Sequence, residues 1–326
     1  MPITCPICPR HCSIARGQTG FCKVRTNVND QIVSTVYGRT SGCAVDPMEK
    51  KPLYHFYPAS PIFSVGTLGC NMSCRWCQNA AISKTGDVEK FTRLMSPGEV
   101  AEAAVTNGCE SVAVTYNEPV VWAEYAVDIA EACHERRLNT VAVTNGFIAS
   151  EKRSWFFNAM DAANIDLKGF SEQFYKQETG AELEALKETI QFVAHETNCW
   201  LELTTLLIPG VNDNIDDMQR MGEWICKAIG AETPLHLSAF HPAHEYQNIA
   251  TTPLKTLFQT REIMKQCGLC YVYVGNVNDS AGQITQCPQC GQAVILRYEY
   301  KVEDIKIDED QCCRYCGQTI AGRFNN

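Results

Sequence analysis

Hydrophobic and polar positions follow two different periods along the middle of the chain. Short runs rich in β-branched and apolar residues predict strands. Between them, apolar residues recur at every third and fourth position, which predicts amphipathic helices. The predicted strands are residues 61–67, 111–116, 139–144, 162–167, 199–207 and 234–240. The predicted helices are residues 96–108, 119–137, 182–196, 213–230 and 252–268.

Strands that alternate with helices at this spacing indicate an α/β fold with a parallel sheet and right-handed crossovers. The pattern suits an open, doubly wound sheet and a partial (β/α) barrel equally well. In both folds the chemistry lies at the carboxyl ends of the strands. Polar stretches follow the later strands at these ends, namely "TYNEP", "TNGF", "DLKG", "IPGVND" and "FHP". We therefore predict one mouth lined by reactive side chains.

The two flanks of the chain lack this alternation. Residues 1–60 show little helical periodicity and are rich in Pro, Gly and Cys, and residues 281–326 form a short segment bracketed by cysteines. We predict three parts: an N-terminal cysteine-rich segment at 1–60, a core domain at 61–280 and a C-terminal four-cysteine ribbon at 281–326.

Charge and hydropathy narrow the class of protein. The chain has 326 residues and a formal net charge of −9, which argues against a general binder of nucleic acids or membrane surfaces. No apolar run approaches the ~20 residues of a membrane helix. The opening "MPITCPICPRHC" has no features of a signal peptide. We expect a cytoplasmic protein.

The 19 cysteines of the chain add metal chemistry to this picture. Most of them fall in groups with close C-x2-C spacings, which in a reducing compartment indicate metal binding. The groups are Cys5, Cys8, Cys12 and Cys22; Cys70, Cys74 and Cys77; and Cys287, Cys290, Cys312, Cys313 and Cys316.

The middle group, Cys70, Cys74 and Cys77, has the spacing C-x3-C-x2-C and follows the first predicted strand. Three thiolates are too few for a closed tetrahedral zinc site. A [4Fe–4S] cluster normally takes four cysteine ligands, so three leave one iron free to bind a small molecule. A zinc site that borrows a distant fourth ligand is the alternative.

This motif, in its place after the first strand, resembles that of the radical S-adenosylmethionine (radical SAM) superfamily. The resemblance implies a partial (β/α)6 barrel. It also implies a [4Fe–4S] cluster on the three cysteines and reductive cleavage of SAM to a 5′-deoxyadenosyl radical. The stretches "TYNEP" (115–119), "DLKG" (166–169) and "LIPGVND" (207–213) are similar to those of glycyl-radical-enzyme activating enzymes.

A narrower resemblance covers nearly the whole chain. The stretches at 5–27, 49–58 ("EKKPLYHFYP") and 271–277 ("YVYVGNV") are similar to those of the radical SAM component of the AmmeMemoRadiSam system. That system implies companion proteins as partners. A flavodoxin- or ferredoxin-type protein is the electron donor that this chemistry implies.

Several residues are candidates for binding SAM. We expect Asn117 and Glu118 to bind its α-ammonium group, although a turn that caps the next helix would use the same residues. Asp166 and Lys168 alternate on one strand and so face the same side. They would bind the carboxylate or ribose of SAM, or form a structural ion pair.

Four further residues are weaker candidates for contacts with the cluster or with SAM. Trp76 would pack near the cluster or the adenine, or in the core. Thr144 and Asn145 could contact the ribose hydroxyls, or form a plain turn. His241 is our candidate for an adenosyl contact, whereas His236 lies within a strand and suits a core histidine.

The terminal cysteines predict two more metal sites. Cys287, Cys290, Cys313 and Cys316 form paired C-x-x-C-G knuckles, which suit Zn²⁺ or rubredoxin-type iron, with Cys312 left out. Cys5, Cys8, Cys12 and Cys22 could hold zinc or a second iron–sulfur cluster, with His11 as an alternative ligand.

Three functions compete on these grounds. The first is a radical SAM oxidoreductase that abstracts hydrogen from a protein or peptide, as an activating enzyme does. The second is radical modification of a small molecule. The third is a non-enzymatic, zinc-binding scaffold.

Overall fold

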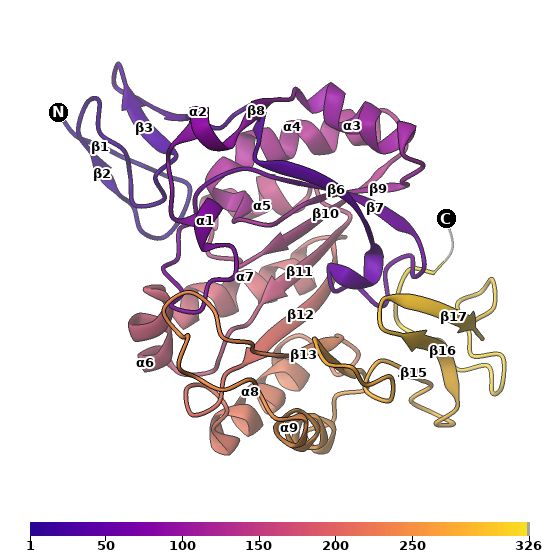
Figure 1. Cartoon of the computed structure of the whole chain (residues 1–326). Coiled ribbons are helices and arrows are strands. Elements are labelled where there is room, and N and C mark those ends of the chain that lie inside the picture. The colour runs from indigo at the N-terminus through magenta and orange to yellow at the C-terminus, as the bar shows by residue number, and fades with distance from the viewer. Residues whose placement is uncertain (325–326) are drawn as a thin grey trace.

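One mostly parallel sheet of eight strands forms the centre of the protein (Figure 1). The computed structural model describes residues 1–324. The strands are β6 (Gly42–Pro47), β7 (Pro61–Gly66), β9 (Ser111–Val114), β10 (Asn139–Thr144), β11 (Ala162–Asp166), β12 (Trp200–Leu207), β13 (Leu235–Ala239) and β14 (Val272–Gly275). Their order is β14-β13-β12-β11-β10-β9-β7-β6, and only β6 runs antiparallel to its neighbour.

This order decides between the two architectures that the sequence pattern allows. From β7 to β14 each strand of the sheet pairs with the next one along the chain, so the order never reverses. A doubly wound sheet needs such a reversal, and a barrel does not. The fold is therefore a partial barrel, as expected. Its end strands, β6 and β14, do not pair with each other.

Helices cover the outer face of the sheet (Figure 1). The longer ones are α3 (Pro97–Thr106), α4 (Ala123–His134), α5 (Ser150–Phe157), α7 (Leu183–Glu196), α8 (Ile215–Ala228) and α9 (Leu254–Gln266). Short turns of helix are α1 (Ala80–Ser83), α2 (Val88–Phe91), α6 (Glu172–Phe174), η1 (Met48–Lys50), η2 (Pro119–Trp122) and η3 (Tyr175–Thr179). No helix in residues 1–324 has the length and apolar character that a membrane crossing requires.

Local sequence signals explain most of these elements. All six predicted strands are present, and α3 begins at a capping box in which Ser96 and Glu99 bond to each other's backbone. The sequence did not predict β14, β6 or α5. Strand β6 lies in the segment predicted as 1–60 yet pairs with β7, for example Val45 with Phe63. The boundary between the N-terminal segment and the core domain after residue 60 stays a prediction.

The N-terminal segment consists of small antiparallel pairs: β1 (Ile3–Thr4) with β2 (Ser13–Ile14), β3 (Arg25–Val28) with β4 (Gln31–Ser34), and β5 (Arg39–Thr40) with β8 (Arg93–Leu94). Arg25 anchors this segment to the barrel. Its side chain is 2% exposed, donates to the carbonyl of Val121 at 2.9 Å and pairs with Glu124 of α4.

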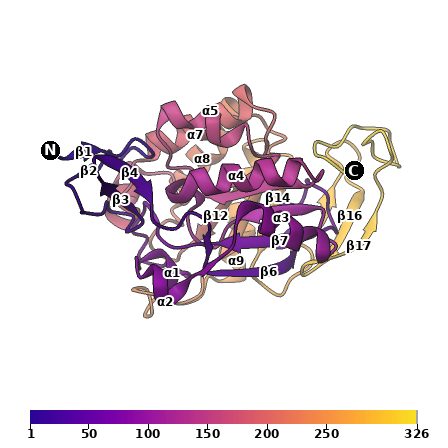
Figure 2. The ribbon, with the colours of Figure 1, turned by 90° about the horizontal axis from the view of Figure 1, so that it is seen from above.

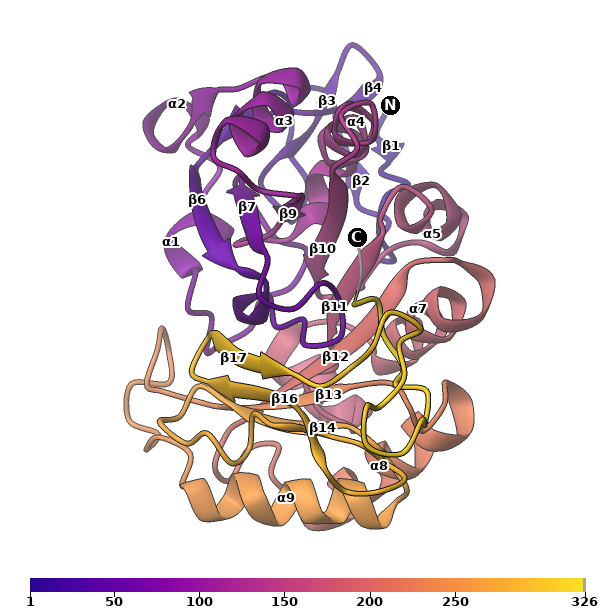
Figure 3. The same cartoon turned by 90° about the vertical axis from the view of Figure 1, so that its right-hand side faces the viewer.

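The C-terminal ribbon is a three-stranded sheet of β15 (Thr285–Gln286), β16 (Ala293–Tyr298) and β17 (Lys301–Ile305). It packs near the starts of β11 and β12, where Arg323 donates to the carbonyl of Asp161 at 3.1 Å. Figure 3 shows the ribbon in front of the strands at this end. Figures 1 and 2 place the ribbon and the N-terminal segment at opposite ends of the sheet.

Candidate active site

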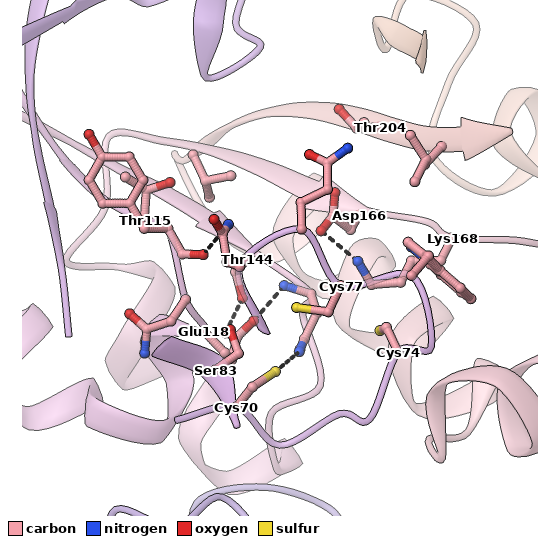
Figure 4. A pocket seen from close by; sticks show the side chains of 18 of the residues that line it. Cys70, Cys74, Cys77, Ser83, Thr115, Glu118, Thr144, Asp166, Lys168 and Thr204 are labelled. Carbon is pink, nitrogen blue, oxygen red and sulfur yellow. Dashed lines mark hydrogen bonds and ion pairs between the residues drawn. The ribbon is translucent and has the colours of Figure 1, made fainter. Parts of the chain in front are cut away.

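A pocket of about 440 Å³ lies at the carboxyl ends of the barrel strands (Figure 4). Side chains that follow β7, β9, β10 and β11 line it, because the carboxyl ends of parallel strands meet at one edge of a sheet. The sequence predicted the following lining residues: Cys70, Cys74, Trp76, Cys77, Asn117, Glu118, Thr144, Asn145, Asp166 and Lys168.

Cys70, Cys74 and Cys77 enter this pocket from the loop after β7. Among residues 1–324, no other cysteine lines the pocket, so it holds three thiols without a fourth. Within residues 1–324, the C-terminal knuckles form the one group of three or more cysteine, histidine or carboxylate side chains whose ligand atoms all lie within 4.8 Å of one another. The three pocket thiols are thus spread more widely than ligands of a single ion. This spread fits a [4Fe–4S] cluster, in which each thiolate binds a different iron.

Burial makes two of these thiols, those of Cys70 and Cys74, poor nucleophiles in the absence of a metal. Burial raises the pKa of Cys70, and the nearby carboxylate of Glu118 raises it further. Burial also raises the pKa of Cys74, against the opposing charge of Lys168. Metal binding would have to displace these protons, since iron binds the thiolate.

Asn117 holds the cysteine loop rather than only facing the pocket. Its Oδ1 accepts from the backbone N–H of Thr67 at 2.8 Å, and its Nδ2 donates to the carbonyl of Gly69 at 2.9 Å. Asn145 acts in the same way, because its Nδ2 lies 2.9 Å from Oδ1 of Asn71 and 3.7 Å from Sγ of Cys70. Both amides therefore position the loop that carries the thiols.

Glu118 is buried and hydrogen-bonded on both oxygens. The hydroxyl of Thr144 donates to Oε1 at 2.5 Å, and the backbone N–H of Asn145 donates to Oε2 at 2.7 Å. Its Oε1 also caps η2 by accepting from the N–H of Val120 at 3.0 Å. The capping alternative raised by the sequence is thus realised. Burial raises the pKa of Glu118 to about 7, although these hydrogen bonds oppose the rise.

Asp166 and Lys168 lie on the same side, as their alternation predicts, and Nζ of Lys168 is 2.7 Å from Oδ2 of Asp166. Burial alone would lower the pKa of Lys168, but the charges of Asp166 and Cys74 outweigh it and the pKa is raised. The lysine is therefore a fixed positive charge beside the thiols (Figure 4).

Trp76 is buried and lies nearly parallel to Phe174, with ring centroids 5.6 Å apart. His241 differs from the other candidates because it does not line the pocket. Its imidazole is exposed, and Nε2 lies 3.1 Å from the carbonyl of Asn276. Strand β13 ends at Ala239, and the chain turns outward before His241, so Ser238 lines the pocket instead. His236 is a core histidine, 2.6 Å from Glu202.

Sequence reasoning missed the side of the pocket formed by Lys50, Lys51 and Tyr116. Lys51 is 4% exposed, and its Nζ lies 2.6 Å from Oδ2 of Asp46. Lys50 reaches Oδ1 of the same carboxylate at 2.7 Å, so two lysines share one aspartate. The consecutive lysines were visible in the sequence, but nothing local showed that β6 would bring them to the pocket.

The C-terminal knuckles bring their four thiols together as predicted. Sγ of Cys287 lies 3.6 Å from Sγ of Cys316, and Sγ of Cys290 lies 3.8 Å from Sγ of Cys313. Tetrahedral Zn²⁺ with bonds of about 2.3 Å places its sulfurs about 3.8 Å apart. The set can therefore bind one metal ion and fits a zinc ribbon. Cys312 is outside it, near the hydroxyl of Thr319.

Comparison with known proteins agrees with this site. The model of the Radical SAM superfamily matches residues 64–225. The uncharacterized protein MJ0808 of Methanocaldococcus jannaschii is 40% identical over 319 residues, covering 98% of this chain and 95% of that protein. The 4-hydroxyphenylacetate decarboxylase activating enzyme of Clostridioides difficile is 30% identical over 105 residues, covering 31% of this chain and 33% of that enzyme.

A solved structure shows the same fold. The crystal structure of a radical SAM methyltransferase from Sphaerobacter thermophilus has a TM-score of 0.54 at 16% identity, covering 73% of this chain and 71% of that one. A partial barrel with three thiols in one pocket at its mouth defines a class of iron–sulfur enzyme. The chain belongs to the radical SAM superfamily, and about a third of it is similar to an activating enzyme.

Proposed function

We propose that this chain cleaves SAM reductively and uses the resulting 5′-deoxyadenosyl radical to abstract hydrogen from a protein or peptide. The observation that carries the proposal is the pocket with three thiols and no fourth. A [4Fe–4S] cluster bound by Cys70, Cys74 and Cys77 would supply one electron and an open iron for the amino and carboxylate groups of SAM. The pocket's own residues supply the remaining functions.

The charged side chains of the pocket match the ends of a methionyl group. A carboxylate has about four acceptor sites, and the three donors to Glu118 leave room for one N–H of the SAM amino group. Lys168 supplies a positive charge beside Cys74, which suits a carboxylate. We assign Glu118 as the acceptor for the N–H groups of the SAM amino group and Lys168 as the partner of its carboxylate. We assign contacts with the ribose hydroxyls of SAM to Thr144 and Asn145. The position of His241 does not support a contact with the adenosyl group.

A protein or peptide substrate is supported by the open side of the barrel and by the relatives. Strands β6 and β14 stand at opposite ends of the strand order, so the sheet is not closed around the pocket. The name of the 4-hydroxyphenylacetate decarboxylase activating enzyme describes an action on another enzyme. Membership of the AmmeMemoRadiSam system, its companion proteins as partners, and a cytoplasmic location stay predictions.

The first experiment tests SAM cleavage. The protein is loaded anaerobically with iron and sulfide, reduced with dithionite and examined by electron paramagnetic resonance (EPR) with and without SAM. We expect a [4Fe–4S]⁺ signal that changes with SAM, together with 5′-deoxyadenosine. Both should be lost in Cys74→Ala and kept in Cys226→Ala, a cysteine outside the pocket. A well-loaded protein without a SAM response would contradict the proposal and favour a zinc scaffold.

A second experiment separates the two substrate classes. Extract from cells grown in deuterated medium is divided by ultrafiltration into macromolecular and small-molecule fractions. Each is incubated with enzyme, reductant and unlabelled SAM, and 5′-deoxyadenosine is analysed by mass spectrometry. Deuterium that comes from the macromolecular fraction and disappears after protease treatment supports a polypeptide substrate. Deuterium from the small-molecule fraction alone would make small-molecule modification the function.

A further inference from the structure

The four N-terminal cysteines form one compact group outside the SAM pocket. The β1–β2 hairpin brings the first and third together, since the N–H of Cys5 donates to the carbonyl of Cys12 at 2.9 Å. Cys8 lies in the turn that leads back to Cys12, since the N–H of His11 donates to its carbonyl at 3.1 Å. The segment before Cys22 packs on Cys12, because a Cβ atom at Gly20 would lie 3.6 Å from Cβ of Cys12. Cys5, Cys8 and Cys22 are buried and Cys12 is partly exposed. Four neighbouring thiols, three of them buried, have the composition of a metal site.

The spacing of these thiols differs from that of the C-terminal knuckles. A single tetrahedral ion needs sulfurs about 3.8 Å apart. The knuckle sulfurs have this spacing, at 3.6 and 3.8 Å. Within residues 1–324, no three of the N-terminal thiols lie within 4.8 Å of one another. They share this wider spread with the three pocket thiols, which suits a cluster that offers each thiolate its own iron.

The N-terminal group lies directly against the loop that carries the pocket thiols. Gly69 precedes Cys70 and has φ +86°, and a Cβ atom there would collide with the carbonyl oxygen of Cys22. The two backbones can therefore touch only because residue 69 is glycine.

Arg10, between Cys8 and Cys12, fastens the two loops together. Its Nε donates to the carbonyl of Asn71 at 2.5 Å, and its Nη2 donates to the carbonyl of Gly180 at 2.5 Å. A further bond of 3.1 Å runs from the N–H of Ala149 to the carbonyl of Ile7. Each of these contacts joins the N-terminal group to the carboxyl-end side of the barrel. The C-terminal knuckles lie at the opposite end (Figures 1 and 2).

We propose that Cys5, Cys8, Cys12 and Cys22 bind a second [4Fe–4S] cluster, which passes electrons to the cluster of the SAM pocket. A reduced ferredoxin- or flavodoxin-type protein gives one electron to the N-terminal cluster and is itself oxidised by one electron. That cluster returns to its 2+ state as the pocket cluster goes from 2+ to 1+. No bond forms or breaks, and no proton moves. The relay rests on the proposed function, whereas the existence of the N-terminal cluster does not.

The cluster is tested in a variant that cannot load the SAM pocket, Cys70→Ala/Cys74→Ala/Cys77→Ala. After anaerobic loading we expect about four iron and four sulfide per chain, measured apart from the zinc content. We also expect a reduced [4Fe–4S]⁺ EPR signal that SAM does not change. Adding Cys8→Ala should remove this signal, and adding Cys312→Ala should not. A triple variant that carries no sulfide would overturn the proposal, and zinc beyond the one ion of the C-terminal knuckles would show that the N-terminal site holds a single ion instead.

The relay is tested by comparing two reductants. In the wild type, both dithionite and a reduced flavodoxin should produce the SAM-responsive EPR signal. In Cys8→Ala, the SAM-responsive signal should be lost with flavodoxin and kept with dithionite. The dithionite signal also shows that the variant is folded. Equal ratios in the two proteins would overturn the relay. A wild type that carries both clusters yet gives no 5′-deoxyadenosine with dithionite would instead contradict SAM cleavage and leave the second cluster standing.

Discussion

The hydroxyl of Thr144 donates a hydrogen bond to Oε1 of Glu118 at 2.5 Å and so joins the ends of two neighbouring strands. Glu118 follows β9 and Thr144 is the last residue of β10, 26 positions further along the chain. The bond fixes a carboxyl group within a buried site, where water cannot solvate its charge. Its protonation state therefore depends on what binds beside it.

Glu118 predicts that SAM binding depends on pH. Its pKa is about 7 in the free protein, chiefly because it is buried, so the carboxyl is half protonated near neutrality. A hydrogen bond donated by the amino group of SAM favours the ionised form, so binding releases a proton and strengthens as pH rises. Below about pH 7 the affinity should rise towards tenfold per pH unit and then level off.

Titration of SAM into the iron-loaded protein between about pH 6 and 8 measures this dependence. Glu118→Gln should flatten the profile and weaken binding by about tenfold or more at the upper end. Glu184→Gln, on the outer helix α7, is the matched control. A wild-type profile retained in Glu118→Gln would show that another group binds the amino group of SAM.

Because we assign Lys168 to the carboxylate of SAM, we predict that replacing this lysine lowers the affinity of the protein for SAM. Lys168→Met removes the positive charge and leaves Asp166 and Cys74 without a partner. Since hydrogen bonds to charged groups contribute about 1.5–3 kcal/mol, SAM affinity should fall at least about tenfold. Lys187→Met, which breaks a pair with Glu184 on α7, serves as control in the same titration. Unchanged affinity in Lys168→Met would leave the Asp166 pair as a structural ion pair.

The C-terminal knuckles predict a metal-dependent stability. Arg297 of β16 is buried and donates to the carbonyl of Tyr54 at 2.5 Å, so the ribbon is joined to the barrel. Loss of the metal should loosen the ribbon and leave that guanidinium without its partners. Cys313→Ala should lose one metal ion per chain and lower Tm by several degrees, as about 1–2 kcal/mol of stability would.

Metal analysis, thermal unfolding and limited proteolysis of residues 281–324 check this expectation. The neighbouring substitution Cys312→Ala is the matched control, because its sulfur lies outside the four-thiol set. If Cys313→Ala kept both its metal and its Tm, the four thiols would not be the binding site.

Because His55 is buried, we predict that the free energy of unfolding falls in mild acid. The residue is fully buried, which lowers its pKa to about 4. Its Nδ1 faces the carbonyl of Ala321 at 2.6 Å, and its Nε2 faces the hydroxyl of Tyr273 at 2.5 Å, a pairing that suits a neutral ring. The unfolded state takes up its proton near pH 6.5, so stability is present above that pH and is lost as pH falls towards 4. The full difference is worth about 3 kcal/mol.

Guanidinium unfolding at intervals from about pH 7 to 4 measures this loss. His195→Gln, an exposed histidine, should retain the decline, and His55→Asn should flatten it. A wild-type free energy of unfolding that stays level down to about pH 5 would contradict this assignment.

Much of the site could be predicted from the sequence because its parts are local. The residues that follow each strand are fixed by covalent order, and carboxyl ends of parallel strands must meet. Cys70, Glu118, Thr144 and Asp166 therefore share a pocket once the strands are recognised. The same reasoning explains why His241 does not line the pocket. The chain leaves the strand two residues earlier, and a side chain beyond a turn has no fixed direction.

Other features depend on contacts between distant segments. The approach of Lys51 to the pocket requires β6 to add to the barrel antiparallel to β7. Its partner Asp46 lies nearby in sequence, yet the burial of the pair does not follow from that spacing. The contact of Arg10 with Gly180 spans 170 positions, and no local pattern encodes it.

The sequence by itself determined the order of the βα units, the residues at their ends and the grouping of the thiols, because periodicity and spacing are properties of neighbouring residues. Only the tertiary structure decided that the strand order never reverses, that Cys22 packs on Gly69, and that the ribbon lies at the far end. It also decided that the knuckle thiols have the spacing of one ion and the other two sets do not. These relationships arise from the packing of segments far apart in the chain, which depends on the shape and burial of whole surfaces.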